Sequence, residues 1–259
     1  MRTFTLKGLF VTAVFMLLGC LAIHAADGDL ITKQITIKLE EAGTLPSKIG
    51  DTKKYKITNL KIMGEINGTD LRFIRKMAGC NEEGRRTEGE LATLDLSGSK
   101  IVKGGDIYFY SSYFYCYTSD DVIGGYAFYG CSSLTSLTLP SSVTEIGRSA
   151  FYGCSGLTSI YVSWESPLSI DAYTFKDANT EKCILYVPNG TYDDYWISNW
   201  GIFENIVEYD ATGINRITTS GDAKEISRYA VDGQRLEVPA KGLNIVKYSD
   251  GCVKKVVVQ

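Results

Sequence analysis

The side chains that could do chemistry are few and badly spaced for it. The acidic residues form two adjacent pairs, Asp120-Asp121 and Asp193-Asp194. Neighbouring residues on an extended chain point to opposite faces, so neither pair is a ready acid–base dyad, and no calcium-loop spacing surrounds them. We interpret both pairs as solvated loop residues, with weak calcium binding as the alternative.

Histidine is almost missing from the chain. The one histidine among 259 residues, His24, lies inside the segment that we expect to be removed on export. A mature chain without histidine cannot build a Ser-His-Asp or Cys-His pair or a His-ligated metal site. The sequence therefore predicts no enzyme, no metal and no cofactor. A glycosidase that uses carboxylates alone would need two inward acids roughly 5–10 Å apart, and no sequence feature indicates them.

The first 25 residues indicate export. Arg2 and Lys7 precede an apolar run over residues 9–23 that ends in small residues, which is typical of a secretory signal peptide and too short for a spanning helix. We expect cleavage after Ala25 and a protein that is secreted or displayed at the cell surface.

Cys20 offers a second route to the surface. Residues 17–20, Leu-Leu-Gly-Cys, resemble a bacterial lipobox, so lipidation at Cys20 is the alternative to plain cleavage. The apolar residues 21–23 that follow favour plain cleavage. Membrane contact is expected only through such an anchor.

Charge and cysteine content narrow the class of partner. The whole chain carries a formal net charge of −3, and loss of the two basic residues of the signal makes the mature chain more acidic. A weakly acidic surface argues against nucleic acid. Six of the seven cysteines remain after cleavage: Cys80, Cys116, Cys131, Cys154, Cys183 and Cys252. An even number in an exported chain is compatible with disulfides, but Cys131 and Cys154 share one phase of a repeat, which favours a ladder of packed thiols.

Residues 123–162 contain two copies of one sequence repeat. Eight residues return twenty-three positions later: Ile123, Ala127, Phe128, Gly130, Cys131, Leu134, Leu137 and Leu139 recur as Ile146, Ala150, Phe151, Gly153, Cys154, Leu157, Ile160 and Val162. A fixed period in the twenties is the signature of a solenoid, in which each unit buries its apolar face against its neighbours.

The spacing inside a unit predicts where side chains point. Leu134, Leu137 and Leu139 form an L-x-x-L-x-L pattern whose last two leucines point inward from a short strand, while Ser136 and Thr138 point to the other face. The I-x-x-x-x-F half supplies the return segment, with phenylalanine as a wedge on the convex side.

Degenerate copies extend the array in both directions. Ile170, Phe175 and Leu185 continue it downstream, whereas residues 57–62 and 91–96 match only the strand half. We expect five strands in one sheet and a sixth, weaker one near residues 206–209.

Both ends of the array need caps, because a terminal coil would otherwise expose its apolar side. We expect a strand within residues 30–42, a turn and charged loop over 43–55, and a short helix that begins near 67–70 and ends at Gly79. At the other end Tyr192, Tyr195, Trp196, Trp200 and Phe203 are expected to form a short helix that closes the last coil. Residues 210–259 predict three hairpin-linked strands: 226–232, 242–248 and 253–259.

The repeat text resembles a known family. The A-F-x-G-C-S-x-L-x-S pattern of residues 123–162 is similar to the BspA-like bacterial surface leucine-rich repeats, strongly to residue 162, fairly to 188 and thinly before 101. Such proteins are typically exported and bind host matrix components or other cells, so the resemblance implies binding rather than catalysis. Residues 229–235, 242–247 and 254–258 resemble the short C-terminal domain of exported Bacteroidetes proteins, which is related to a secretion-sorting domain.

The predicted fold is a leucine-rich-repeat solenoid, mostly β with short irregular or helical return segments, and a small C-terminal antiparallel β domain. Its parts are the signal peptide (1–25), an N-terminal cap with degenerate repeats (26–90), the repeat array with its C-terminal cap (91–209) and the small β domain (210–259).

Two surfaces are candidates for binding. The first is the exposed strand face, expected to bind proteins on host or microbial surfaces in adhesion: Asn59, Lys61, Thr93, Asp95, Ser136, Thr138, Ser159, Tyr161, Ile184 and Tyr186. The second is the aromatic stretch of residues 108–117, with Tyr108, Tyr110 and Tyr113, which could stack on sugar rings as a carbohydrate-binding module. The plain alternatives are solvent-facing strand residues and convex-side wedges, or a purely structural surface-layer protein.

Overall fold

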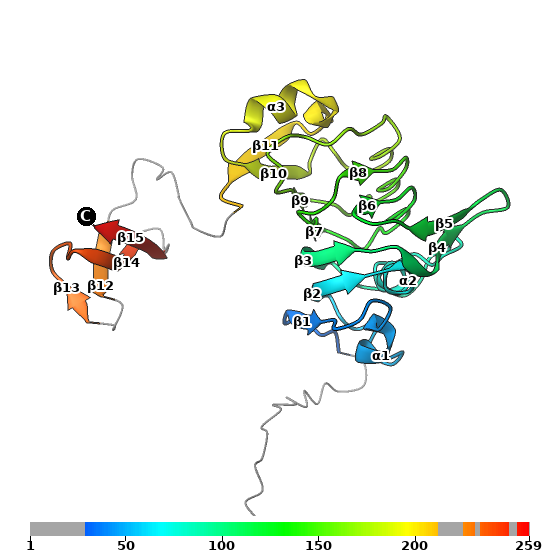
Figure 1. Cartoon of the computed structure of the whole chain (residues 1–259), viewed down its shortest axis with the longest axis horizontal. Coiled ribbons are helices and arrows are strands. Elements are labelled where there is room, and N and C mark those ends of the chain that lie inside the picture. Colours follow the sequence, from blue (N-terminus) through cyan, green and yellow to red (C-terminus); the bar gives the residue numbers. More distant parts are fainter. Residues whose placement is uncertain (1–28, 212–224, 231–233, 249–252, 259) are drawn as a thin grey trace, which may run out of the picture.

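The apolar spacing of the repeats produces a parallel sheet. The computed structural model describes residues 29–211, 225–230, 234–248 and 253–258, so the expected signal peptide, Cys20 and Cys252 lie outside the described residues. Seven strands pair side by side in chain order, all parallel (Figure 1): β1 (Ile35–Lys38), β2 (Asn59–Ile66), β3 (Thr93–Ile101), β7 (Ser136–Thr138), β9 (Ser159–Tyr161), β10 (Ile184–Pro188) and β11 (Asn205–Tyr209).

The register places the repeat leucines in one buried row. Leu94 pairs with Leu137, Leu137 with Ile160, and Ile160 with Leu185, and all four side chains are fully buried. Full burial of such a side chain contributes about 1.5–3 kcal/mol. The inward placement predicted from the L-x-x-L-x-L spacing is confirmed.

The return segments stack as the strands do. Phe128 lies 5.5 Å from Phe151, and Phe151 lies 4.8 Å from Phe175, ring centroid to ring centroid, in near-parallel planes. The backbone N–H of Phe128 donates to the carbonyl of Ala150, and that of Phe151 to the carbonyl of Thr174. Two short parallel strands, β6 (Val122–Ile123) and β8 (Glu145–Ile146), lie in the same segments. Around each phenylalanine the return segment thus donates N–H groups to the next segment along the chain, whereas the Gly147 N–H donates back to the Ile123 carbonyl.

Arg75 donates hydrogen bonds to the backbone carbonyls of the first return segment, because no preceding return segment supplies N–H donors to them. Its Nη1 donates to the carbonyls of Tyr126 (2.7 Å) and Ala127 (3.0 Å), and its Nη2 to those of Tyr129 (3.1 Å) and Asn81 (2.9 Å). The side chain is fully buried. One guanidinium therefore replaces a missing turn of backbone donors.

Helix α2 (Gly68–Met77) carries Arg75 and confirms the expected N-terminal helix. The Asn67 side chain accepts from the Thr69 N–H, and the Asp70 carboxylate accepts from the Asn67 N–H, so both form the helix start. Asp70 also accepts from the Leu45 N–H, where helix α1 (Leu45–Ile49) begins.

Two predictions for the N-terminal cap were incomplete. Residues 43–55 were expected to be a turn and loop but contain α1, because Pro46 suits a first helical turn and Asp70, distant in sequence, fixes the start of the helix. The strand predicted within residues 30–42 exists, and as β1 it pairs with β2 and extends the sheet rather than standing apart.

The C-terminal cap consists of two short helices where one was expected. Helix α3 (Tyr192–Ile197) and the 3-10 helix η1 (Asn199–Ile202) meet at Ser198, whose hydroxyl accepts from the Trp200 N–H. Tyr195, Trp200 and Phe203 are fully buried and close the last coil. Tyr192 and Trp196 were predicted to join them but are exposed.

The aromatic stretch forms a hairpin, β4 (Gly104–Tyr110) with β5 (Tyr115–Thr118). The C-terminal part is a separate antiparallel sheet in the order β13-β12-β14-β15, formed by β12 (Glu225–Ala230), β13 (Arg235–Leu236), β14 (Gly242–Tyr248) and β15 (Val253–Val258). The three predicted strands are present, and the two-residue β13 was not predicted. Among the described residues no helix has the length and apolar character needed to cross a bilayer.

Candidate functional site

The strand face brings the ten predicted residues into two rows. The backbone register aligns Asn59, Thr93, Ser136, Ser159 and Ile184 in one row, and Lys61, Asp95, Thr138, Tyr161 and Tyr186 in the other. All ten are half-buried, because neighbours on adjacent strands cover their flanks. We call this surface the strand face.

The sequence analysis did not predict the residues that β1 and β11 add at the ends of these rows. Thr36 of β1 pairs with Lys61, and Asn205 and Val207 of β11 pair with Ile184 and Tyr186. The alternation of Ile35, Thr36 and Ile37 carried the same signal as the repeats, but the missing leucine pattern hid its place in the sheet.

One end of the strand face is a cluster of three tyrosines, which we call the tyrosine cluster. The rings of Tyr161 and Tyr186 stack 4.3 Å apart with an interplanar angle of 2°. Tyr209 meets both edge-on, at 5.6 Å and 84° from Tyr161 and at 6.3 Å and 86° from Tyr186. Its hydroxyl donates to the Val162 carbonyl at 3.1 Å. Partial burial raises the pKa of Tyr161 and of Tyr209, so both phenols are uncharged at neutral pH.

The other end of the strand face is polar. Lys61 Nζ lies 2.6 Å from Asp95 Oδ2 and donates to Ser97 Oγ at 3.1 Å. Burial raises the pKa of the Asp95 carboxyl, but the hydrogen bonds from Lys61 and Ser97 outweigh it and hold that pKa below its usual value. The Ser159 hydroxyl donates to the Ser136 hydroxyl at 2.9 Å.

The hairpin divides its aromatic residues between core and solvent. Tyr108 is only 1% exposed, and its hydroxyl donates to the Gly125 carbonyl at 2.9 Å, so the prediction that Tyr108 contributes to binding is wrong. Strand β4 runs back against the first return segment, where Tyr108 and Phe109 fill the core. Tyr113, in contrast, is 93% exposed, and Tyr115 and Tyr117 are also exposed.

Tyr110 is half-buried and helps to line a cavity of about 370 Å³ beside the hairpin. Its ring lies 6.2 Å from that of Tyr115, and its hydroxyl donates to the Glu83 carboxylate. Arg85 pairs with Glu83 at 2.8 Å and also lines the cavity. An aromatic pair beside fixed charges has the composition of a ligand site.

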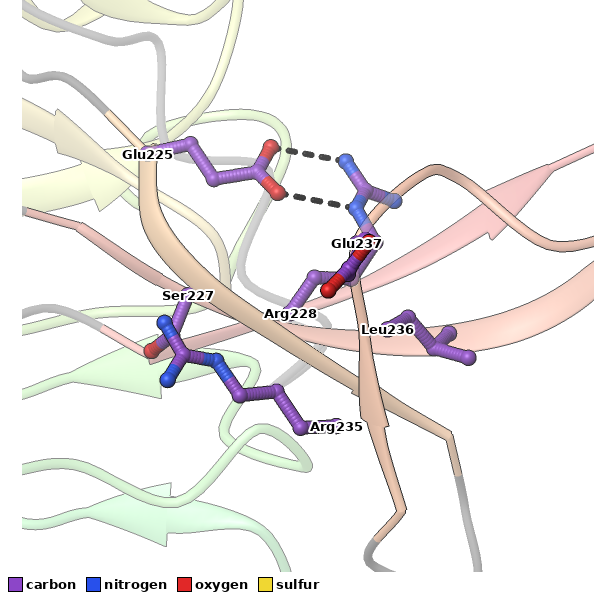
Figure 2. A pocket seen from close by; sticks show the side chains of 6 residues that line it. All are labelled: Glu225, Ser227, Arg228, Arg235, Leu236 and Glu237. Carbon is purple, nitrogen blue, oxygen red and sulfur yellow. Dashed lines mark hydrogen bonds and ion pairs between the residues drawn. The ribbon is translucent and has the colours of Figure 1, made fainter.

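A second cavity, of about 580 Å³, lies on the C-terminal sheet (Figure 2). Glu225 holds the Arg228 guanidinium through both carboxylate oxygens, at 2.9 Å to Nε and 2.8 Å to Nη2. Asn244 accepts from Arg228 Nη1 at 3.0 Å. This arrangement ties β12 to β14, and we interpret it as a structural ion pair.

The cysteines are structural where the structure describes them. Cys80, Cys131, Cys154 and Cys183 are buried, Cys116 is half-buried, and these five are free thiols. Burial raises the pKa of Cys131 and of Cys183 to about 12, so neither forms a thiolate near neutral pH. The Cys154 thiol donates to the Phe128 carbonyl at 3.0 Å, within the predicted thiol ladder.

The paired acids have structural partners or face solvent. Asp120 accepts from the Lys103 N–H at 2.8 Å, and Asp121 lies 3.6 Å from Lys100. Asp193 and Asp194 are exposed in the first turn of α3, where they suit the positive end of the helix. Over the described ranges no group of three His, Cys, Asp or Glu residues could hold a metal ion.

Comparison with known proteins agrees with the repeat geometry. No curated protein is similar enough to the chain to count as a relative. The family described as "BspA type Leucine rich repeat region" matches residues 112–210 in six copies, which covers β7 to β11, while β1, β2 and β3 lie upstream of the match. Residues 112–210 are therefore similar to a BspA-type leucine-rich repeat region, and repeats of this class suggest protein–protein interaction.

Proposed function

We propose that this chain is an exported recognition protein, secreted or held at the cell surface, that binds proteins on host or microbial surfaces in adhesion. In this proposal the repeats form a solenoid that presents the strand face, and the protein binds without catalysing a reaction. The absence of histidine from the expected mature chain supports binding rather than catalysis.

The tyrosine cluster is the observation that carries the proposal. Stacked and edge-on aromatic rings hold one another in place, so binding costs them little conformational entropy. Large, stiff, half-polar side chains dominate the energetics of protein interfaces. The cluster lies at the end of a row of small polar side chains, which suits a hot spot next to a complementary polar surface.

The Lys61–Asp95 pair adds orientation to this surface. Both charges are held by each other and by Ser97, so the face shows a fixed dipole rather than a net charge. Such pairs contribute to the choice of partner and its register more than to affinity.

The test is binding of the mature chain, residues 26–259, to a panel of host matrix proteins and glycans. We expect a protein ligand whose affinity falls at least about tenfold when Tyr161 and Tyr186 are both changed to alanine, because hot-spot truncation costs roughly 2 kcal/mol or more. Tyr115→Ala is the matched control, since Tyr115 is an exposed tyrosine away from the strand face. A protein ligand bound equally by the double variant would place recognition elsewhere.

Carbohydrate binding at the hairpin is the second candidate. Three tyrosines, Tyr113, Tyr115 and Tyr117, are exposed on one hairpin, and exposed aromatic groups of this size usually mark a contact surface. A glycan ligand that the strand-face variant retains and Tyr115→Ala loses would favour this candidate.

Export and its mode are tested on protein made in its own host. We expect the measured intact mass to equal that of a chain whose first residue is Ala26. A mass that fits a chain starting at a lipid-modified Cys20 would support the lipoprotein alternative. For the C-terminal sheet we keep the sorting hypothesis, and a truncation at Asp210 that still reaches the surface would contradict it.

A further inference from the structure

The C-terminal cap contains a cavity that neither candidate above uses. It measures about 590 Å³ and lies between the last return segment and the α3–η1 junction, where Asp171, Ala172, Trp196, Asn199 and Ile202 line it. Small-molecule sites of proteins typically measure about 300–1,000 Å³. The cavity therefore has room for a ligand of one or a few sugar rings.

Trp196 is the unusual residue of this cavity. The chain has three tryptophans, and Trp164 and Trp200 are buried, whereas Trp196 is 50% exposed. Its ring lies parallel to that of Tyr192, at 7° and 6.2 Å between centroids. Capping the last coil does not require Trp196, because Tyr195, Trp200 and Phe203 fill that core.

The backbone beneath Trp196 is held rigidly. The Tyr195 hydroxyl donates to the Trp164 carbonyl at 2.9 Å, and Trp200 Nε1 donates to the Leu168 carbonyl at 2.7 Å. Gly201 approaches the Trp196 carbonyl so closely that a Cβ atom would lie 2.4 Å from it. The backbone that carries the indole is therefore fixed, which lowers the conformational entropy lost when a ligand binds.

Two oriented acceptors line the same cavity as Trp196. Asp171 Oδ1 accepts from the Tyr173 N–H (2.8 Å) and from the Thr174 hydroxyl (3.1 Å), while Asn199 Nδ2 donates to the Ile170 carbonyl (2.8 Å). These bonds fix both side chains. Asp171 Oδ2 and Asn199 Oδ1 have no hydrogen-bond partner within the part of the chain that the structure describes.

We propose that this cavity binds an uncharged pyranose unit of a glycan. The apolar C–H face of the sugar would stack on the Trp196 indole, and two of its hydroxyls would donate to Asp171 Oδ2 and Asn199 Oδ1. Ala172 and Ile202 supply the apolar wall. An acidic sugar or a phosphate fits poorly, because no lysine or arginine lines the cavity and the Asp171 carboxylate would repel it.

Tryptophan fluorescence gives a direct test. Because Trp164 and Trp200 are buried, fluorescence that acrylamide can quench in the mature chain comes mainly from Trp196. The probes are neutral mono- and oligosaccharides of glucose, galactose, mannose and N-acetylglucosamine. We expect at least one to protect this fluorescence from quenching, and titration calorimetry with the same sugar to give saturable binding.

Two variants localise the binding. Trp196→Ala should abolish the calorimetric signal, and Asp171→Asn should weaken binding at least about tenfold. The asparagine Oδ1 can still accept from the Tyr173 N–H and the Thr174 hydroxyl, while the NH2 group that replaces Oδ2 donates hydrogen bonds and cannot accept one from the sugar. The controls Tyr115→Ala and the Tyr161/Tyr186 double alanine variant should bind the sugar like the wild type, so this result is independent of the other two sites. Failure of every probe to protect Trp196, or unchanged binding by folded Asp171→Asn, would overturn the proposal.

Discussion

At the scale of single residues, Arg75 replaces a structural element. Its guanidinium is buried in the core and has no carboxylate partner among the described residues. Its N–H groups donate instead to the backbone carbonyls of Tyr126, Ala127 and Tyr129. Buried carbonyls without a donor cost about 1–3 kcal/mol each. The first return segment therefore depends on this one side chain.

We predict that Arg75→Leu destabilises the protein by about 3 kcal/mol, because the leucine leaves the buried Ala127 carbonyl and three partly buried carbonyls without this donor. The measurement is urea unfolding followed by far-UV circular dichroism. Arg72→Leu serves as the control on the same helix, since Arg72 makes a partly exposed ion pair with Asp106, and such pairs contribute about 0–1 kcal/mol. Equal midpoints for the two variants would contradict the role given to Arg75.

The Lys61–Asp95 pair predicts a pH dependence. The folded pKa of Asp95 is lower than its usual value, so its contribution to stability is present above the ordinary carboxyl pKa of about 4 and is lost as pH falls through the folded pKa. We expect Asp95→Asn to reduce the free energy of unfolding by up to about 1 kcal/mol at neutral pH. That difference from the wild type should shrink below about pH 4. Urea unfolding midpoints at several pH values measure this difference, and the exposed Asp193→Asn variant is the control. A difference between wild type and Asp95→Asn that grows in acid would contradict a lowered pKa of Asp95 in the folded protein.

At the scale of elements, the thiol ladder follows from the repeat period. Cys131 and Cys154 occupy equivalent positions behind the stacked phenylalanines, where the fold leaves room for a small apolar side chain. The same phase in neighbouring coils makes the thiols a packing feature rather than a reactive site.

We predict that a thiol reagent modifies Cys116 in the native mature chain before the buried Cys80, Cys131, Cys154 and Cys183, since Cys116 is the least buried of the described cysteines. Burial also raises the pKa of the buried thiols, which lowers their thiolate fraction. In denaturant without reductant we expect all six mature cysteines to titrate. Mass spectrometry of the labelled peptides measures the order, and a reductant-dependent rise in the denatured count would reveal a disulfide.

How far the sequence predicted each element depended on how complete its repeat pattern was. Residues 123–162 carry the whole unit, so their strands and buried leucines were predicted correctly, whereas the sequence predicted the phenylalanines only as wedges and not that their rings stack. Helix α1 was missed because Asp70, twenty-five residues away from Leu45, sets its start. The exposure of Trp196 was missed because α3 is too short to show an apolar periodicity.

The two surfaces differed in the same way. The strand face was predictable because strand alternation fixes which side chains leave the core. The division of the hairpin into buried Tyr108 and exposed Tyr113 depended on where β4 packs against the first return segment, and no local pattern encodes that contact.

At the scale of the whole array, one row of buried side chains runs through the sheet. Leu137 lies near its middle, between Leu94 and Ile160, so each half of the array is packed against the other at this position. In repeat proteins each unit is stabilised mainly by its nearest neighbours. A defect at Leu137 should therefore uncouple the two halves.

We predict that Leu137→Asp destabilises the array by more than about 4 kcal/mol, since it buries an unpaired charge and removes a core side chain. Hydrogen exchange with mass spectrometry should show lost protection spreading from β7 into β3 and β9, while distant β1 and β11 keep more of theirs. Ser136→Asp is the matched control, because Ser136 is the adjacent residue on the opposite, solvent-facing side of the same strand and its substitution should leave protection nearly unchanged. Equal exchange in the two variants would mean that the leucine row does not hold the sheet together, and would remove the physical basis for treating the strand face as one continuous surface.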